Sequence, residues 1–183
     1  DDGEFAVLSP EKITIYDCTG AEVKRAPSHI DWTMEAAEKG GYPHFMLKEI
    51  MEQPHAVKSA IEPRLKDGRV VLGSLELSRA QLEDIRSIVI TACGSAYHAG
   101  CVGRYAIEEL CRIPVQVEVA SELRYRNPLI DEHTLLIVIS QSGETADTIA
   151  AMKECKKRGA RAIAIVNVVD STIARLADDV LYT

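Results

Sequence analysis

Long apolar runs, aromatic side chains and a surplus of positive charge are all missing or scarce in this sequence of 183 residues. No run approaches the roughly 20 apolar residues that a membrane-spanning helix requires, so an integral membrane protein is excluded. Asp and Glu number 28 against 21 Lys and Arg, and the net charge of −7 leaves no basic surplus to neutralise nucleic-acid phosphates. Aromatic residues make up only 5%, too few for base-stacking platforms. The composition therefore predicts a globular protein that binds neither membranes nor nucleic acids.

Spacings of cysteine and histidine that indicate zinc sites or disulfide frameworks are also missing. The five cysteines are odd in number, none belongs to a C-x-x-C pair, and the five histidines are scattered. We therefore expect reduced thiols, a cytoplasmic location, and neither a metal nor a cofactor. The start, Asp-Asp-Gly, resembles no signal peptide, and the lack of an initiator methionine indicates a piece of a longer chain. The cysteines are Cys18, Cys93, Cys101, Cys111 and Cys155.

Residues 1–25 predict a small β-hairpin arm. Apolar runs at 5–8 and 13–16 flank a Ser-Pro-Glu-Lys segment, and a turn at Thr19-Gly20 leads into a third short run. Because three short strands are marginally stable alone, this arm should need a partner to pack on.

The segment that follows the arm predicts a linker and then helices. Residues 26–42 are weakly patterned and contain Pro and Gly, with one turn of helix expected near 34–37. Pro43 suits the first position of a helix, which Pro54 should break or kink before a second helix over 56–62.

From residue 87 onward, apolar strand candidates alternate with helical periodicity. Helices are expected over 99–110 and 146–155, the second ending in a basic turn and Gly159, and a capping-box pattern at Ser78 opens a short helix upstream. This alternation predicts an α/β fold, with a doubly wound, mainly parallel five-stranded sheet covered on both faces. The strand candidates are residues 88–91, 115–119, 135–139, 162–166 and 180–182.

Two strand-to-helix turns of this body are candidates for the functional site. Ligands of open parallel sheets bind at the carboxyl ends of the strands, near a topological switch point. The second turn, which follows the strand expected at 135–139, is dense in hydroxyls and precedes a helix N-terminus. Free N–H donors and the helix dipole favour an anion there. This turn therefore predicts a phosphate-binding site. The two turns are Thr91-Ala-Cys93-Gly94-Ser95-Ala96 and Ser140-Gln141-Ser142-Gly143-Glu144-Thr145.

The same residues allow plainer interpretations. Ser and Thr are the usual helix N-caps, and Glu144 opposes a phosphate unless its side chain points away. Cys93 and His98 are a conceivable nucleophile pair, although a structural thiol is commoner. Neither turn has the glycine patterns of dinucleotide or ATP sites, and the G-x-S-x-G of hydrolases is absent.

Several motifs, taken together in collinear order, resemble one known family, the glutamine-dependent glucosamine-6-phosphate synthases (glutamine:fructose-6-phosphate amidotransferases). The likeness covers essentially the whole chain and implies that residues 43–183 are the first sugar-isomerase (SIS) domain, flavodoxin- or Rossmann-like, and that the arm is the end of a glutaminase domain. The motifs are Asp17-Cys-Thr-Gly-Ala-Glu-Val-Lys24, His44-Phe-Met-Leu-Lys-Glu-Ile50, Ala92-Cys-Gly-Ser-Ala-Tyr97, Val119-Ala-Ser-Glu-Leu-Arg-Tyr-Arg126 and Ser140-Gln-Ser-Gly-Glu-Thr-Ala-Asp147.

This resemblance implies an enzyme that frees ammonia from glutamine, adds it to fructose 6-phosphate and isomerises the product to glucosamine 6-phosphate. It also implies a homodimer, and a glutaminase domain and a second SIS domain as missing parts. No catalytic residue carries over to these residues, so the chain alone should be catalytically incomplete. By motif, Ser140, Gln141, Ser142 and Thr145 would surround the phosphate, and Cys93, Gly94 and Ser95 would line the sugar.

Two positions depart from the family pattern, and two other functions stay open. Ala96 stands where the family usually has a hydroxyl, and Asp170 stands where Gly is common. The alternatives are a non-catalytic sugar-phosphate sensor and a nucleotide-binding module. Stabilisation by hexose phosphates, rather than by NAD or ATP, separates the nucleotide-binding alternative from the other two.

Overall fold

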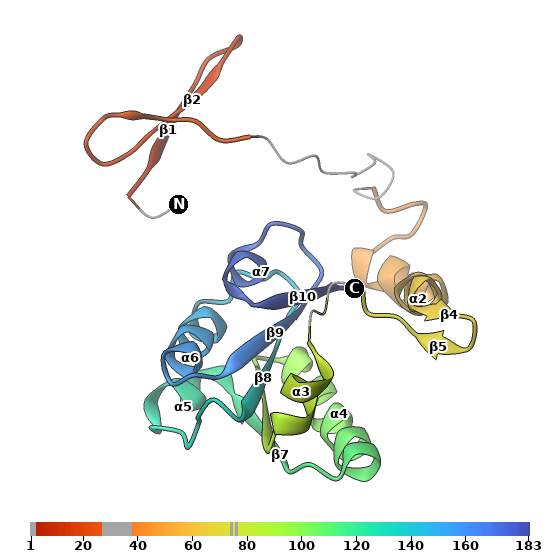
Figure 1. Cartoon of the computed structure of the whole chain (residues 1–183). Helices are drawn as coiled ribbons and strands as arrows, with labels where there is room; N and C mark the ends of the chain where they lie inside the picture. The colour runs from red at the N-terminus through yellow and green to blue at the C-terminus, as the bar shows by residue number, and fades with distance from the viewer. Residues whose placement is uncertain (1–2, 27–37, 74, 76) are drawn as a thin grey trace. The chain divides into compact units, whose positions relative to one another are not determined.

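The computed structural model describes residues 3–26, 38–73, 75 and 77–183. The chain divides into two compact units, residues 1–33 and 34–183, which Figure 1 traces from red to blue. The helical turn expected near 34–37 lies outside the described residues.

The N-terminal unit is the expected β-rich arm. Three antiparallel strands pair in the order β1-β2-β3, with Phe5 opposite Tyr16. The Asp17 carboxylate fixes the second turn by accepting the backbone N–H of Ala21 at 3.0 Å. Phe5 and Leu8 keep 54% and 73% of their surface exposed, so the arm by itself buries little apolar surface. The strands are β1 (Phe5–Leu8), β2 (Ile13–Tyr16) and β3 (Glu22–Val23).

The second unit opens with one long helix, where the sequence predicted two. Helix α2 runs from Phe45 to Ile61 with Pro54 inside it, and His44 rather than Pro43 precedes its first residue. The expected break is wrong because proline removes only one helical hydrogen bond, while the turns on both sides keep theirs. An ion pair from Lys48 to Glu52 and another from Lys58 to Glu62 also support these two halves.

A short hairpin after α2 escaped the sequence analysis. The 3-10 turn η1 (Glu62–Arg64) leads into β4 (Leu65–Lys66) and β5 (Arg69–Val70), which pair antiparallel. Asp67 and Gly68 both have positive φ, at 51° and 72°, as an Asp-Gly hairpin turn requires.

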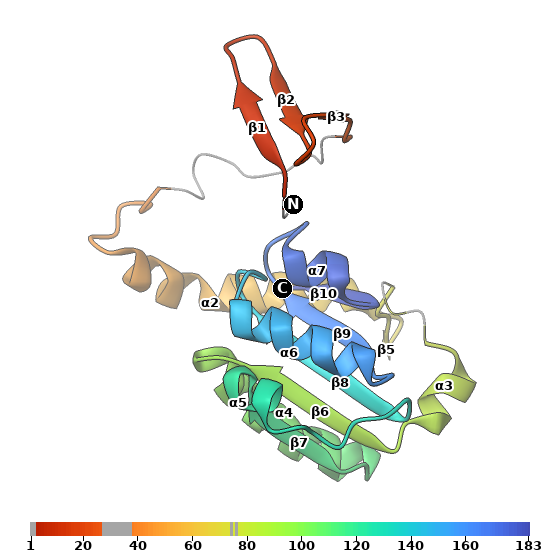
Figure 2. The same cartoon turned by 90° about the vertical axis from the view of Figure 1, so that its left-hand side faces the viewer.

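The five-stranded parallel sheet predicted for the body is confirmed. Its strands lie in the order β10-β9-β8-β6-β7, and every neighbouring pair is parallel. The central pair, β6 and β8, ends in register, with Ala92 opposite Ile139. Figure 2 shows these strands running side by side. Their bounds are β6 (Ser87–Ala92), β7 (Val115–Val119), β8 (Thr134–Ser140), β9 (Arg161–Val166) and β10 (Asp179–Tyr182).

Helices cover both faces of this sheet. One face carries α3 (Arg79–Asp84) with its predicted capping box and α4 (Ser95–Cys111), which begins four residues before its expected start. The other face carries α5 (Ala120–Tyr125), α6 (Ala146–Lys157) and α7 (Thr172–Leu176). The sequence did not predict α5 and α7, since five or six residues are too few for a helical period to show. No helix in the described residues is both long and apolar enough to span a membrane.

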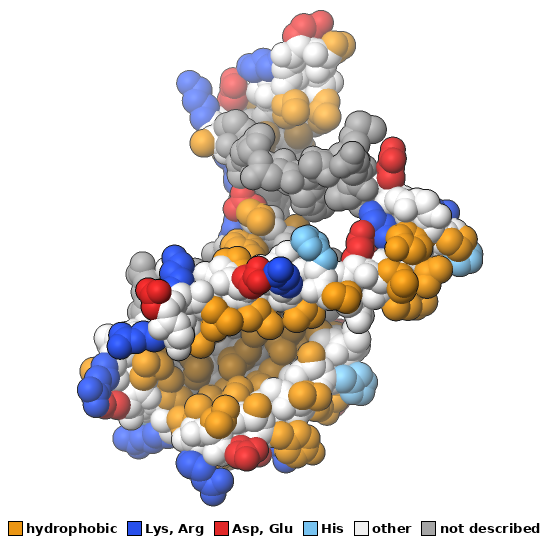
Figure 3. All heavy atoms as spheres, turned by 90° about the vertical axis from the view of Figure 1, so that its right-hand side faces the viewer, with side chains coloured by type: hydrophobic (Ala, Val, Ile, Leu, Met, Phe, Trp, Pro, Cys, Tyr) orange, Lys and Arg blue, Asp and Glu red, His pale blue; other side chains and the backbone are white. Residues whose placement is uncertain are grey.

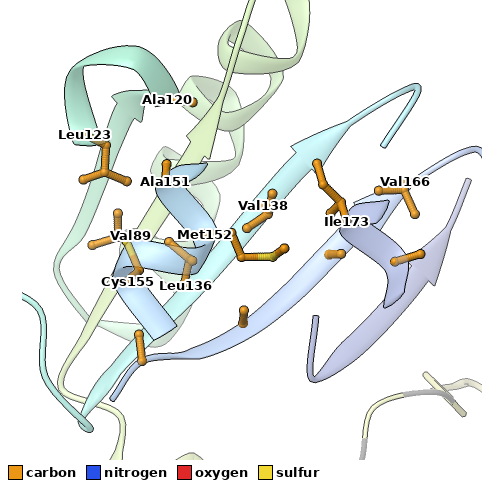
Figure 4. Packing of buried hydrophobic residues seen from close by; sticks show 14 residues of the cluster. Val89, Ala120, Leu123, Leu136, Val138, Ala151, Met152, Cys155, Val166 and Ile173 are labelled. Atoms are coloured by element: carbon orange, nitrogen blue, oxygen red, sulfur yellow. The ribbon is translucent and has the colours of Figure 1, made fainter. Parts of the chain in front are cut away.

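Two apolar layers hold the helices to the sheet. On the α6 face, Leu136 and Val138 of β8 meet Met152 and Cys155, all of them fully buried (Figure 4). On the other face, Gly100 lets α4 approach the sheet, because a Cβ there would lie only 2.9 Å from the Ile90 side chain. This packing holds the N-termini of α4 and α6 next to the carboxyl ends of β6 and β8, on opposite faces of the sheet.

Candidate functional site

The two predicted turns meet at the switch point of the sheet. From β6 the chain crosses through α4 to β7 at one edge, and from β8 it crosses through α6 in the opposite direction to β9. Because β6 and β8 are neighbouring parallel strands, their carboxyl ends lie side by side. The turns that follow them start there and lead to helices on opposite faces of the sheet. Ligands of doubly wound sheets bind in such a crevice.

The turn after β8 is held by its own hydroxyl groups. Buried Ser140 accepts the N–H of Gly143 at 3.1 Å, and its Oγ lies 3.3 Å from Thr145 Oγ1. Ser142 Oγ accepts the N–H of Glu144 at 3.2 Å. Gly143 adopts a positive φ of 67°, which glycine tolerates best. The exposed Gln141 completes the turn, so the predicted phosphate residues form one continuous loop.

The start of α6 offers donors that its own side chains do not use. Thr145 is the N-cap residue, yet its side chain makes no capping hydrogen bond. Among the described residues, the N–H groups of Ala146, Asp147 and Thr148 meet no acceptor. Unpaired N–H groups at a helix N-terminus form a site for an anion. The plain capping interpretation therefore fails for Thr145.

The Glu144 carboxylate is bonded to the start of α7 and not to these donors. Its Oε1 accepts the backbone N–H of Thr172 at 2.6 Å, at the start of α7. Hydrogen bonds from Thr172, first from its backbone and then from its side chain, lower the pKa of Glu144, and the charge of Arg175 adds to this. The carboxylate is thus occupied elsewhere, which removes the objection that it raised against a phosphate.

The turn after β6 reaches the same place from the neighbouring strand. Cys93 is half-buried and its Sγ lies 3.7 Å from Thr148 Oγ1, in the first turn of α6. Gly94 precedes α4 with a positive φ of 59°, and Ser95 is exposed as the first helical residue. The structure therefore brings Cys93 to the first turn of α6, directly after the hydroxyl-rich loop.

The alternative pairing of Cys93 with His98 does not form. His98 is exposed, and its ring contacts Tyr97 with 5.5 Å between centroids. Within the described residues, no hydrogen bond joins Cys93 to His98. Among all the residues that the structure describes, no group of three or more His, Cys, Asp or Glu side chains could hold a metal ion.

A third segment, the loop between β9 and α7, was missed by the sequence analysis. Ser171 is 3% exposed and packs against Gly143 so closely that a Cβ on the glycine would lie 2.0 Å from its Oγ. That Oγ has no hydrogen-bond partner among the described residues. In the same loop, Asp170 has a φ of 60°, which explains why a glycine suits this position. A Ser before a short helix indicates only a cap, so nothing local could have linked Ser171 to the turn.

A separate cavity of about 1010 Å³ lies between α2 and the ends of β9 and β10. It is lined by the α2 residues Ala56 and Ala60, by Arg64, and by Asn167 and Tyr182 on the sheet side. Hydrophobic side chains gather around a hollow on the face shown in Figure 3. None of the sequence-predicted site residues lines this cavity.

An open parallel sheet whose switch point carries unpaired helix N–H groups is typical of doubly wound α/β domains that bind ligands. Comparison with known proteins narrows this class. Residues 81–183, more than half of the chain, match the SIS domain family, and the chain belongs to that family.

Individual relatives match a larger part of the chain. It is 56% identical over 183 residues to a glutamine–fructose-6-phosphate aminotransferase (isomerizing) of Clostridium tetani, and 53% identical to one of Caldanaerobacter subterraneus. Each match covers 100% of this chain but only 30% of the relative. The solved C-terminal domain of glucosamine-fructose-6-phosphate aminotransferase from Francisella tularensis has a TM-score of 0.73 at 42% identity, covering 80% of this chain and 42% of that one.

Proposed function

We propose that this chain is the sugar-phosphate-binding part of an enzyme that makes glucosamine 6-phosphate from fructose 6-phosphate and glutamine. The observation that carries the proposal is the hydroxyl-rich turn after β8, which leads into a helix with unpaired N–H groups, while the Glu144 carboxylate is bonded to Thr172. The match of the whole chain to aminotransferases supports fructose 6-phosphate as the sugar and favours an enzyme over a sensor.

In this proposal the chain binds and orients the sugar phosphate. The phosphate lies at the N-terminus of α6, where backbone N–H groups and the helix dipole offset its charge. The sugar extends toward the turn after β6. The proposed phosphate contacts are Ser140, Gln141, Ser142 and Thr145, and the proposed sugar contacts are Cys93, Gly94 and Ser95.

The remaining steps belong to parts of the relatives that this chain does not span, since it covers 30% of their length. The proposal divides the chain into the end of a glutaminase domain (1–25), a linker (26–42) and a first SIS domain (43–183). It also includes a homodimer in the cytoplasm, with a glutaminase domain and a second SIS domain as partners. No residue here is assigned to ammonia release or proton transfer, so the isolated chain should produce no glucosamine 6-phosphate.

A thermal-shift titration tests the proposal. At about 100 times its dissociation constant, fructose 6-phosphate should stabilise the chain by roughly 2.7 kcal/mol, whereas fructose at the same concentration should not. NAD and ATP serve as the nucleotide controls. Stabilisation by a nucleotide but not by the sugar phosphate, or by fructose as strongly as by its phosphate, would contradict the proposal.

A further inference from the structure

An acidic residue in the middle of an anion-binding turn requires an explanation. A carboxylate beside a phosphate repels it, yet Glu144 lies between Ser142 and Thr145, two of the proposed phosphate contacts. Its carboxylate instead makes a short hydrogen bond to the backbone of Thr172, which lies 28 residues further along the chain.

Three hydrogen bonds fasten the loop after β9 to this turn. Asn167 N–H donates to the carbonyl of Gln141 at 3.3 Å, and Ile173 N–H donates to the carbonyl of Gly143 at 3.0 Å. The third is the bond from Thr172 N–H to Glu144 Oε1 at 2.6 Å. Of these three bonds with backbone donors, only this shortest one has a side chain as its acceptor, and the Thr172 hydroxyl hydrogen-bonds the same carboxylate. Substituting Glu144 therefore removes the side-chain contacts and leaves the two backbone bonds in place.

The same contacts hold Gly143 in its unusual conformation. Ser171, directly before Thr172, presses its buried Oγ against Gly143, which has a φ of 67°. If α7 moved away, this contact would open and the turn could relax. The hydroxyls of Ser142 and Thr145 lie on either side of that glycine, so their positions depend on it.

The charges around Glu144 favour its bond to the start of α7. The positive charge of Arg175, one turn into α7, helps to lower the pKa of Glu144, and its guanidinium donates to the Asp170 carbonyl and to Thr172 Oγ1 at 3.3 Å. The carboxylate also lies at the N-terminal end of α7, where a negative charge is stabilised.

We propose that Glu144 is a positioning residue, which clasps the start of α7 to the phosphate turn and thereby holds the hydroxyls of Ser142 and Thr145 in place for a sugar phosphate. The carboxylate does not touch the ligand. This inference rests on the function proposed above. It gives a role to an acidic residue whose charge alone would disfavour it beside a phosphate.

The sign of a mutational effect separates the clasp from simple repulsion. If Glu144 only repelled the phosphate, Glu144→Ala would strengthen binding. The clasp predicts the opposite, an affinity for fructose 6-phosphate about tenfold weaker by isothermal titration calorimetry, because one charge-assisted hydrogen bond is lost. Glu144→Gln keeps an acceptor for Thr172 N–H and should stay within about threefold of the unaltered chain.

Two further variants control this comparison. Glu83→Ala removes the same charge from α3, outside both turns, where Glu83 pairs with Arg79 at 2.8 Å, and should leave binding unchanged. Thr172→Pro removes the donor instead of the acceptor, and proline suits the first residue of a helix. It should weaken binding as much as Glu144→Ala does, and the double variant should lose no more than either single variant.

Amide hydrogen exchange of the ligand-free chain tests the clasp without any ligand. Exchange over residues 140–146 should become severalfold faster in Glu144→Ala and Thr172→Pro, and stay unchanged in Glu83→Ala. Unchanged exchange in the first two variants, or binding as tight as in the unaltered chain, would overturn the inference. If the unaltered chain fails to bind fructose 6-phosphate, the proposed function fails, while the exchange comparison still decides whether the clasp exists.

Discussion

The turns after β6 and β8 leave neighbouring strands at the same sheet edge, and each leads into a helix of at least twelve residues. In the turn after β8, Ser140 and Ser142 accept backbone N–H groups, and the loop before α7 closes over Gly143. In the turn after β6, a Cβ on Gly94 would meet nothing within 4 Å. The turn after β8 (residues 140–145) is thus held by its own hydroxyls and by the loop before α7, and we call it the braced turn. The turn after β6 (residues 93–95) has open space around Gly94, and we call it the open turn.

This difference indicates how the two turns divide the binding of a sugar phosphate. A phosphate is a fixed tetrahedral dianion, and donors that are already in place bind it at little entropic cost. A sugar offers several hydroxyls and ring forms, so an open turn can accommodate it. The braced turn therefore suits the phosphate, and the open turn suits the sugar.

The largest expected effect comes from adding one methyl group to the braced turn. Gly143→Ala would place a Cβ 2.0 Å from Ser171 Oγ at a positive φ, so we expect a loss of about 3 kcal/mol in unfolding free energy. Gly94→Ala meets strain but no clash and should cost about 1 to 2 kcal/mol.

Urea unfolding measures both variants against a third glycine. Gly103→Ala lies in the middle of α4 with open space around it and should be neutral or stabilising by up to about 1 kcal/mol. Equal losses at Gly143 and Gly94 would show that the bracing has no energetic consequence.

The second prediction separates binding from capping. Thr145 makes no capping bond, so Thr145→Ala should lower stability by less than about 1 kcal/mol. Affinity for fructose 6-phosphate should fall about tenfold or more, since hydrogen bonds to charged groups contribute about 1.5 to 3 kcal/mol.

Ser78→Ala is the matched control for that experiment. Ser78 caps α3 by accepting the N–H of Gln81 at 3.3 Å, away from the site. Its loss should cost about 1 kcal/mol of stability without changing affinity. If Thr145→Ala loses no more affinity than Ser78→Ala for the same loss of stability, the hydroxyl of Thr145 is structural only.

The third prediction concerns the open turn. Alkylation of half-buried Cys93 by iodoacetamide, followed by mass spectrometry, should slow severalfold in saturating fructose 6-phosphate, because the sugar covers the thiol. Cys111 is exposed and should react equally with and without ligand. Cys155 should stay unmodified at pH 8, because burial raises the pKa of its thiol to about 11. Unchanged labelling of Cys93 at saturation would remove it from the sugar contacts.

The smallest effect is a pH dependence of the braced turn. The pKa of Glu144 is lowered from its ordinary value of 4.5, so its ionised form stabilises the fold above that value and the contribution is lost as pH falls through the lowered pKa. Urea unfolding should therefore show the unaltered chain more stable than Glu144→Gln at pH 7, with the difference closing as the pH falls below 4.5. A difference that persists or grows in acid would contradict this assignment.

Much of the sheet followed from the sequence, because each buried strand is a short apolar run. The runs expected at 115–119 and 162–166 coincide with β7 and nearly with β9. Helix boundaries were less accurate: Pro54 ends no helix, and α4 starts at Ser95 before its apolar period becomes visible. Propensity is a local property, and tertiary packing overrides it.

The candidate site could likewise be predicted only in part from the sequence. The two turns could be predicted together, since a parallel sheet brings the ends of neighbouring strands to one edge. The roles of Glu144 and Ser171 could not, because they depend on a loop 28 residues further along the chain folding back onto Gly143. Sequence periodicity carries no information about such an approach.

The most direct test of the central claim is an amide NMR titration of the chain with fructose 6-phosphate. We predict saturable shifts centred on residues 142–146, with smaller shifts at 93–95 and none at those positions with fructose alone. Saturable shifts confined to other residues, such as those lining the cavity beside α2, or an unperturbed spectrum at millimolar ligand, would contradict the assignment of the phosphate to the turn after β8.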